Sequence, residues 1–194
     1  MEIGATKAVQ DRLKTTKIEE SKGASLVFCW DTHLTKIKGR NVLFIVNASN
    51  RYTIAMTDIE PRNWNYYTMY IRSVIHGVMQ EMGYSEDQIG QYFKMSGDTT
   101  VTKTHGRKSV GGINRMVMDA QYFGKKLEKE AKYQWELSEY LNRDICQPEG
   151  FDAYGYPSEL FKLDMERLGI ISKRKPAKII DFNKYIDTNR STNH

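Results

Sequence analysis

Cysteine and histidine are scarce in this chain, and they are not spaced to bind a metal. The two cysteines, Cys29 and Cys146, lie far apart, no Cys-x-x-Cys pair occurs, and the four histidines are scattered. Zinc-binding sequences usually carry closely spaced pairs of these residues. The sequence therefore predicts no metal site and no cofactor, and it predicts two reduced thiols, as is usual in the cytoplasm.

Long apolar runs are also missing. No stretch approaches the roughly 18 apolar residues of a membrane-spanning helix. The segment 1–4 lacks the basic and apolar regions of a secretion signal. We therefore expect a cytoplasmic protein without a membrane association.

Charge of one sign is not strongly in excess. The 194 residues include 29 Lys and Arg against 24 Asp and Glu, a formal net charge of +5. This modest excess permits an acidic partner such as nucleic acid without requiring one, because it is also ordinary solubilising charge. The length suffices for one well-buried core, with room for a small C-terminal extension.

Short apolar runs separated by turns predict a sheet. Strands are expected near 2–5, over 26–37, 42–46 and 51–57, and near 99–104. The run 42–46 is too short for a helix and rich in branched residues, which is typical of a buried strand. Because the turns between the three middle strands are short, they predict an antiparallel meander.

Helical periodicity fills most of the remaining chain. Helices are expected at 7–14, from Pro61 to about residue 82, after a capping box at Ser85, from about Ser109 onward, and at 158–168. The fold class is therefore α+β, with an antiparallel sheet of four to six strands covered by the two long helices. We expect a core domain at 1–125, a helical extension packed on it at 126–186 with a final strand at 178–182, and a frayed tail at 187–194.

The turn before the helix at Ser109 is the best candidate ligand site. A helix N-terminus offers unpaired N–H groups and a positive dipole end, yet this one carries basic rather than acidic residues. An anion would be held by these groups together. The expected ligand-binding residues are Lys103, Thr104, Arg107, Lys108, Ser109 and Asn114. The competing interpretation is that Arg107 pairs with a carboxylate such as Asp98 and that the nearby glycines allow close packing.

Two secondary candidates accompany this turn. Trp30 and His33 follow a buried strand, where Asp31 and His33 share one face and could serve as an orienting group and a base. Asn47 and Arg51 belong to a polar turn that would lie beside Lys103 if the strands are adjacent. The competing interpretations are that Asp31 and His33 are an exposed pair that is only solvated, and that Asn47 and Arg51 only form the turn.

Several segments resemble a bacterial family defined by a domain of unknown function. The strongest match is 102–114, whose Thr-Lys-Thr, Arg-x-Ser and downstream Asn pattern is similar to that of the family. The opening residues 2–13, the strand around Trp30 and the segment 46–52 are similar as well. The likeness covers about 2–125. Some members of the family are joined to a domain like that of a plasmid-encoded third open reading frame. The resemblance supports an intracellular α+β protein and implies no catalytic residue.

Three functions remain open from the sequence. The first is a non-enzymatic binding module for an anionic ligand, either nucleic acid or an acidic protein surface, using the turn at 103–109 and the basic run at 173–178. The second is a small enzyme for a phosphate-bearing substrate, in which His33 or His105 moves a proton. The third is a structural protein that forms oligomers through its tyrosine-rich faces.

Overall fold

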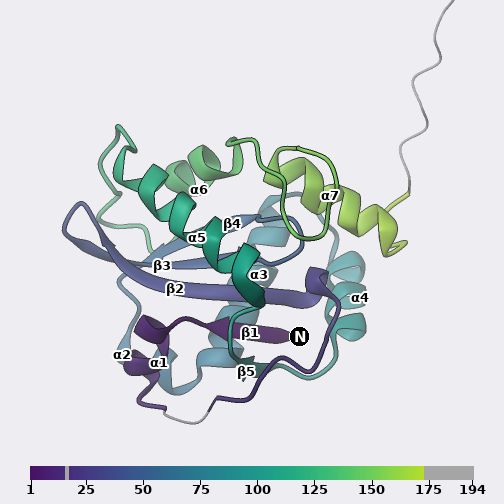
Figure 1. Ribbon diagram of the computed structural model, residues 1–194, viewed down its shortest axis with the longest axis horizontal. Coiled ribbons are helices and arrows are strands. Elements are labelled where there is room, and N and C mark those ends of the chain that lie inside the picture. The colour runs from purple at the N-terminus through teal and green to yellow at the C-terminus, as the bar shows by residue number, and fades with distance from the viewer. Residues whose placement is uncertain (16–17, 173–194) are drawn as a thin grey trace, which may run out of the picture.

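A five-stranded sheet forms the centre of the protein in the computed structural model, which describes residues 1–15 and 18–172 (Figure 1). The strand order across the sheet is β4-β3-β2-β1-β5. The strands are β1 (Glu2–Ala5), β2 (Cys29–Ile37), β3 (Arg40–Asn47), β4 (Thr53–Thr57) and β5 (Thr100–Thr102). The predicted number of strands and the α+β class are thus confirmed.

The sheet is mixed, which corrects the expectation of an antiparallel sheet. Strands β2, β3 and β4 form the predicted antiparallel meander, but β1 lies between β2 and β5 and runs parallel to both. A parallel pair needs a long crossover connection. The segment that contains the first helix connects β1 to β2, and the stretch between β4 and β5 contains three more helices.

Seven α-helices occur among the described residues, rather than two dominant ones. The predicted helix at 61–82 breaks at Tyr66, whose φ of −115° and ψ of 42° are not helical. The helix predicted from Ser109 begins earlier, at Gly106. The helices are α1 (Lys7–Leu13), α2 (Pro61–Asn65), α3 (Tyr67–Glu81), α4 (Glu86–Ser96), α5 (Gly106–Gln121), α6 (Trp135–Asn142) and α7 (Pro157–Arg167), with a 3-10 turn at Leu26–Phe28.

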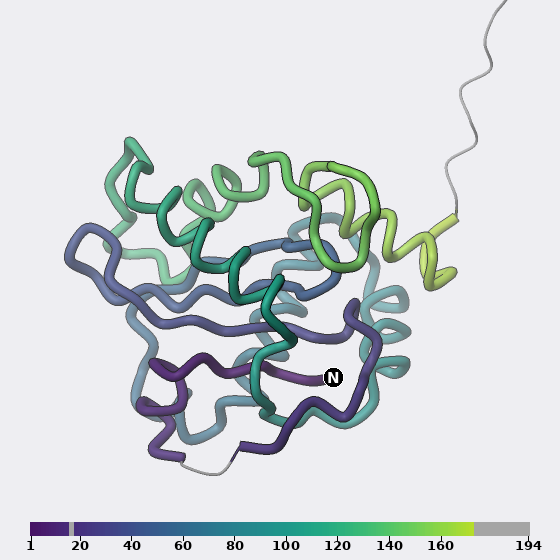
Figure 2. Tube along the Cα trace, in the orientation of Figure 1, coloured from purple at the N-terminus to yellow at the C-terminus, as the bar shows by residue number. Residues whose placement is uncertain are grey.

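Helices cover both faces of the sheet, as the ribbon and the Cα trace both show (Figures 1 and 2). On one face, Trp30 and Ile45 of the sheet pack with Ile71 of α3, Tyr92 of α4 and Phe161 of α7. The opposite face is apolar along β3, where α5 and α6 cover it. That second cluster contains Val42, Phe44, Val46, Ile113 and Leu137 among others.

The chain beyond residue 125 packs directly on this sheet. The backbone N–H of Gln134 donates to Ala55 O and that of Thr57 donates to Lys132 O, so an extended segment covers the free edge of β4. Phe161 of α7 is 1% exposed and lies in the larger core cluster. The predicted strand at 178–182, the basic run at 173–178 and the tail at 187–194 lie outside the described residues.

Within 1–15 and 18–172, the structure has no helix that is both long enough and apolar enough to cross a membrane.

Candidate functional site

Polar residues occupy the sheet face beneath the start of α5. In the parallel pair of β1 and β2, Glu2 lies opposite Cys29 and Gly4 lies opposite Asp31. Side chains alternate along a strand, so these positions all face α5, while Ile3 and Trp30 point to the other core. Asp31 is fully buried. Its carboxylate fits only because Gly4 has no side chain, since a Cβ there would lie 1.8 Å from Asp31 Oδ1.

Asp31 caps the start of α5 from inside the protein. Its carboxylate accepts a hydrogen bond from the backbone N–H of His105, the residue that precedes the helix, at 3.2 Å. It also accepts one from the hydroxyl of Ser109. The unpaired N–H groups and the dipole of a helix start attract negative charge. Here the protein supplies that charge itself.

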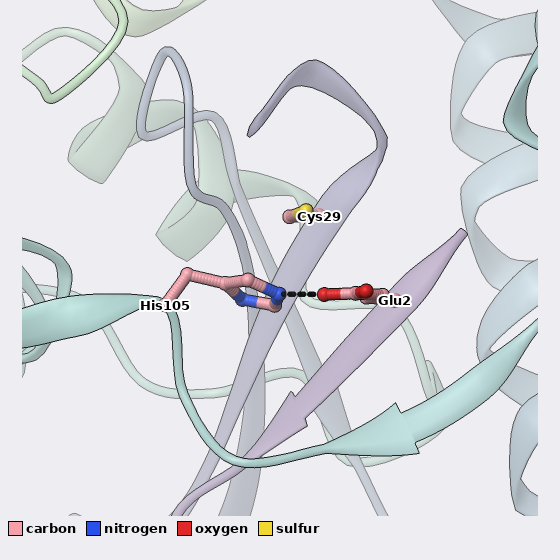
Figure 3. A group of neighbouring side chains, drawn as sticks. All are labelled: Glu2, Cys29 and His105. Carbon is pink, nitrogen blue, oxygen red and sulfur yellow. Dashed lines mark hydrogen bonds and ion pairs between the residues drawn. The ribbon is translucent and has the colours of Figure 1, made fainter. Parts of the chain in front are cut away.

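His105 bridges two buried carboxylates. Its Nδ1 lies 2.7 Å from Asp31 Oδ1 and its Nε2 lies 3.0 Å from Glu2 Oε2, and the three side chains are at most 5% exposed. Glu2 Oε2 also accepts from the hydroxyl of Ser21 at 2.6 Å, and Oε1 accepts from the N–H of Lys22 at 2.8 Å. Figure 3 shows the ring of His105 reaching toward Glu2, with Cys29 nearby.

The surroundings keep this bridge charged. Burial by itself lowers the pKa of His105, but the interactions with Asp31 and Cys29 outweigh it and raise that pKa to about 10. Burial acts to raise the pKa of Glu2, yet its hydrogen bonds with Ser21, Lys22 and His105 leave that pKa below the usual value. At neutral pH the cluster therefore holds an imidazolium beside a carboxylate.

The predicted ligand-binding residues do not converge on one outward-facing site. Ser109 points inward to Asp31, and Lys103 pairs with Glu20 on the surface. Lys108 donates to Pro148 O at 3.2 Å. Thr104 is partly buried over Gly4, whereas Arg107 and Asn114 are exposed. No hydrogen bond or ion pair joins Arg107 to Asp98 or to another residue of the described chain.

The secondary candidates separate from one another in space. Trp30 is buried on the opposite face, where its Nε1 donates to the hydroxyl of Tyr92 at 2.9 Å. Asn47 stabilises its own turn, accepting from the backbone of Ser49 at 3.0 Å. These two side chains hold the fold together rather than facing a ligand.

The contacts of His33 and Arg51 also differ from those expected. His33 contacts Thr6 Oγ1 at 3.2 Å, and Asp31 bonds to His105 instead of His33. Arg51 does reach α5, donating to Gly112 O at 2.7 Å, although at its second turn rather than beside Lys103.

Sequence reasoning did not identify Glu2 and Cys29 as partners of His105. The available signal was the alternation of polar residues, Glu-x-Gly in β1 and Cys-x-Asp in β2, within otherwise apolar strands. It became informative only once the register of the parallel pair was known. Local sequence does not determine that pairing, because it joins segments about 27 residues apart by way of a crossover.

A cavity of about 600 Å³ lies elsewhere, between α6, α7 and the turn at 82–84 that follows α3. Its volume lies in the range of small-molecule sites. Its lining includes four aromatic and two cationic side chains, those of Tyr52, Tyr84, Tyr133, Trp135, Arg143 and Lys162. None of the main cavities in the described part of the chain is lined by Glu2, Asp31 or His105.

Some of the polar groups that line this cavity have a bonding partner among the described residues, and others do not. Arg143 pairs with Glu139 at 2.7 Å. Lys162 is half-buried and has no hydrogen bond or ion pair with any described residue. The hydroxyl of Tyr133 is buried and lacks a hydrogen-bond partner in the same part of the chain. Burial raises the pKa of Tyr84 and of Tyr133 to about 12, so both phenols keep their protons.

Comparison with known proteins places the chain in a family. Neither the curated proteins nor the solved structures contain a significant match to it. The model of one family, described as a domain of unknown function (DUF6933), matches residues 2–160, which include the entire sheet, the cluster around His105 and most of the cavity lining. The chain therefore belongs to the DUF6933 family.

Proposed function

We propose that this protein is a non-enzymatic binding module for an anionic ligand, and that the ligand occupies the cavity between α3, α6 and α7. The ligand class that fits is a planar aromatic anion such as a nucleotide, either free or within a single strand. The observation that carries the proposal is Lys162, a half-buried cation without an acidic partner in the described chain, in a cavity lined by aromatic rings.

The lining offers complementary contacts to both parts of such a ligand. Tyr84, Tyr133 and Trp135 present ring surfaces, and bases stack on aromatic side chains with about 1–3 kcal/mol per base. Lys162 supplies a charge-assisted hydrogen bond to a phosphate or carboxylate.

An enzymatic role for the cluster around His105 receives less support. Its side chains are at most 5% exposed and Asp31 is fully buried. A general base must come within hydrogen-bond distance of the proton that it removes from a substrate. None of the main cavities of the described chain is lined by this cluster, so none of them brings a substrate into contact with it.

The test is calorimetric titration of the protein with adenosine 5′-monophosphate, adenosine and a short single-stranded oligonucleotide over a salt series. We expect the nucleotide to bind more tightly than the uncharged nucleoside. Lys162→Gln should lower nucleotide affinity by about 10-fold or more, because it removes a charge-assisted hydrogen bond, and should leave nucleoside affinity unchanged.

Arg107→Ala is the matched control, because it removes an exposed cation at the start of α5 without touching the cavity. Loss of affinity in Arg107→Ala with retention in Lys162→Gln would move the site to α5. The proposal fails if none of the three compounds binds to the folded protein at millimolar concentration.

A further inference from the structure

The three side chains of Glu2, Cys29 and His105 form a cluster whose donor atoms suit a metal ion. One carboxylate oxygen, the sulfur and one ring nitrogen all lie within 4.8 Å of one another. Glu2 Oε2 and His105 Nε2 are already 3.0 Å apart. We propose that Glu2, Cys29 and His105 bind a zinc ion, a function independent of the cavity between α3, α6 and α7.

The fold brings these donors together from three distant segments. Glu2 and Cys29 are direct partners in the parallel pair of β1 and β2, so their side chains lie side by side on the face below α5. His105 ends the segment between β5 and α5, and its ring points toward Glu2 of β1 (Figure 3). The spacing along the chain therefore resembles no zinc-binding sequence, although the donors converge in space.

The donor types and distances fit zinc. Thiolate, imidazole and carboxylate are its usual ligands, with bonds of about 2.0–2.3 Å in tetrahedral geometry. Those bonds place neighbouring donor atoms about 3.3–3.6 Å apart. Donor atoms that lie within 4.8 Å of one another therefore need to shift by only about 1 Å or less to surround an ion.

The residues around the donors are arranged as in zinc sites. A histidine that binds zinc through one nitrogen typically donates its other N–H to a carboxylate, which orients the ring. Asp31 provides this contact, 2.7 Å from Nδ1. The carboxylate of Glu2 is itself held by the hydroxyl of Ser21 and the backbone N–H of Lys22.

Zinc binds the thiolate of Cys29 and the unprotonated Nε2 of His105, so any proton on either atom is released to solvent as the Zn–S and Zn–N bonds form. The buried carboxylates of Glu2 and Asp31 would face the positive charge of the ion.

The first experiment is titration of the metal-free full chain with Co²⁺, a spectroscopic substitute for zinc, followed by Zn²⁺ competition. We expect a sulfur-to-cobalt charge-transfer absorption that Zn²⁺ abolishes. Cys29→Ser should lose this absorption. Cys146→Ser, which removes the other buried cysteine, should keep it.

Asp31→Asn tests the orienting role of the second carboxylate. Loss of such a contact typically lowers metal affinity by about 10–100-fold, and the tetrahedral cobalt spectrum should persist at higher Co²⁺ concentration. Any variant is compared only if its circular dichroism matches that of the parent.

A measurement on the unmodified protein keeps the proposal testable if the variants do not fold. Zn²⁺ should raise the melting temperature. Under partly denaturing conditions in which both buried thiols react, it should also protect Cys29, but not Cys146, from alkylation as mapped by mass spectrometry. Absence of both effects, absence of the cobalt absorption from the folded parent, or an absorption lost only in Cys146→Ser would overturn the zinc site. Nucleotide binding would be unaffected by each of these outcomes.

Discussion

Single residues determine whether the polar side chains on the sheet face beneath α5 can be buried. Asp31 is fully buried, yet it accepts hydrogen bonds from His105 and Ser109, so its charge is compensated. A buried charge without partners would cost several kcal/mol. Gly4 is the other requirement, because every other residue would place a Cβ on Asp31 Oδ1.

Replacement of this glycine should therefore destabilise the protein strongly. We expect Gly4→Ala to lower the free energy of unfolding by about 2–4 kcal/mol, since overpacking costs about 1–3 kcal/mol and displaced hydrogen bonds add to it. The measurement is urea unfolding at neutral pH.

Gly90→Ala is the control for this substitution. Gly90 is exposed within α4 and nothing lies within 4 Å of a Cβ built there. Alanine should raise the free energy of unfolding by about 0.5–1 kcal/mol, because it favours helix more than glycine does. Equal effects of the two substitutions would show that Asp31 does not require the space above Gly4.

At the scale of elements, α5 is joined to the sheet by its first turns as well as by its apolar stripe. The carboxylate of Asp31 accepts a hydrogen bond from the backbone N–H of His105, just before the helix. Arg51, whose φ is 63°, donates to the carbonyl of Gly112 within it. The guanidinium lies so close that a Cβ on Gly112 would be 2.9 Å from it, whereas a Cβ on Gly111 would meet nothing within 4 Å. Two adjacent glycines in one helix thus have different roles.

The pair Gly111 and Gly112 allows a matched test. Gly111→Ala should raise the free energy of unfolding by about 0.5–1 kcal/mol through helix propensity. The free energy of unfolding of Gly112→Ala should be about 1 kcal/mol lower than that of Gly111→Ala, because the side chain of Arg51 must move and its hydrogen bond is weakened. Thermal or urea unfolding of both variants measures the difference. Equal gains would contradict the close contact.

At the scale of the whole molecule, segments from both ends of the sequence share one core. Phe161 of α7 contacts the rings of Trp30 and Tyr52, with centroids 6.1 Å and 5.3 Å apart. The cavity likewise needs α6, α7 and the turn that follows α3 together. We therefore predict that the chain unfolds as one unit through α7.

Phe161→Ala measures this coupling. We expect the free energy of unfolding to fall by about 3–5 kcal/mol, as for other fully buried phenylalanines. Circular dichroism and tryptophan fluorescence should report the same single transition. Leu163→Ala, two residues along and 43% exposed, should change stability by less than about 0.5 kcal/mol. Separate transitions for α7 and the sheet would show two independent units.

Sequence patterns predicted most elements because their causes are local. Ser85 and Gln88 form the expected capping box, and the meander from β2 to β4 follows from apolar runs joined by short turns. The same local reasoning missed the break at Tyr66 and the earlier start of α5.

The sequence by itself determined the α+β class and the apolar stripes and limited the sheet to four to six strands, because alternation and helical period depend only on neighbouring residues. Only the tertiary structure decided that β1 runs parallel between β2 and β5, because pairing across a crossover depends on contacts between segments far apart in sequence. That choice brings Glu2 and Asp31 beside His105 and directs Ser109 inward. Buried charges require partners, and in this protein those partners come from residues that lie far apart in sequence.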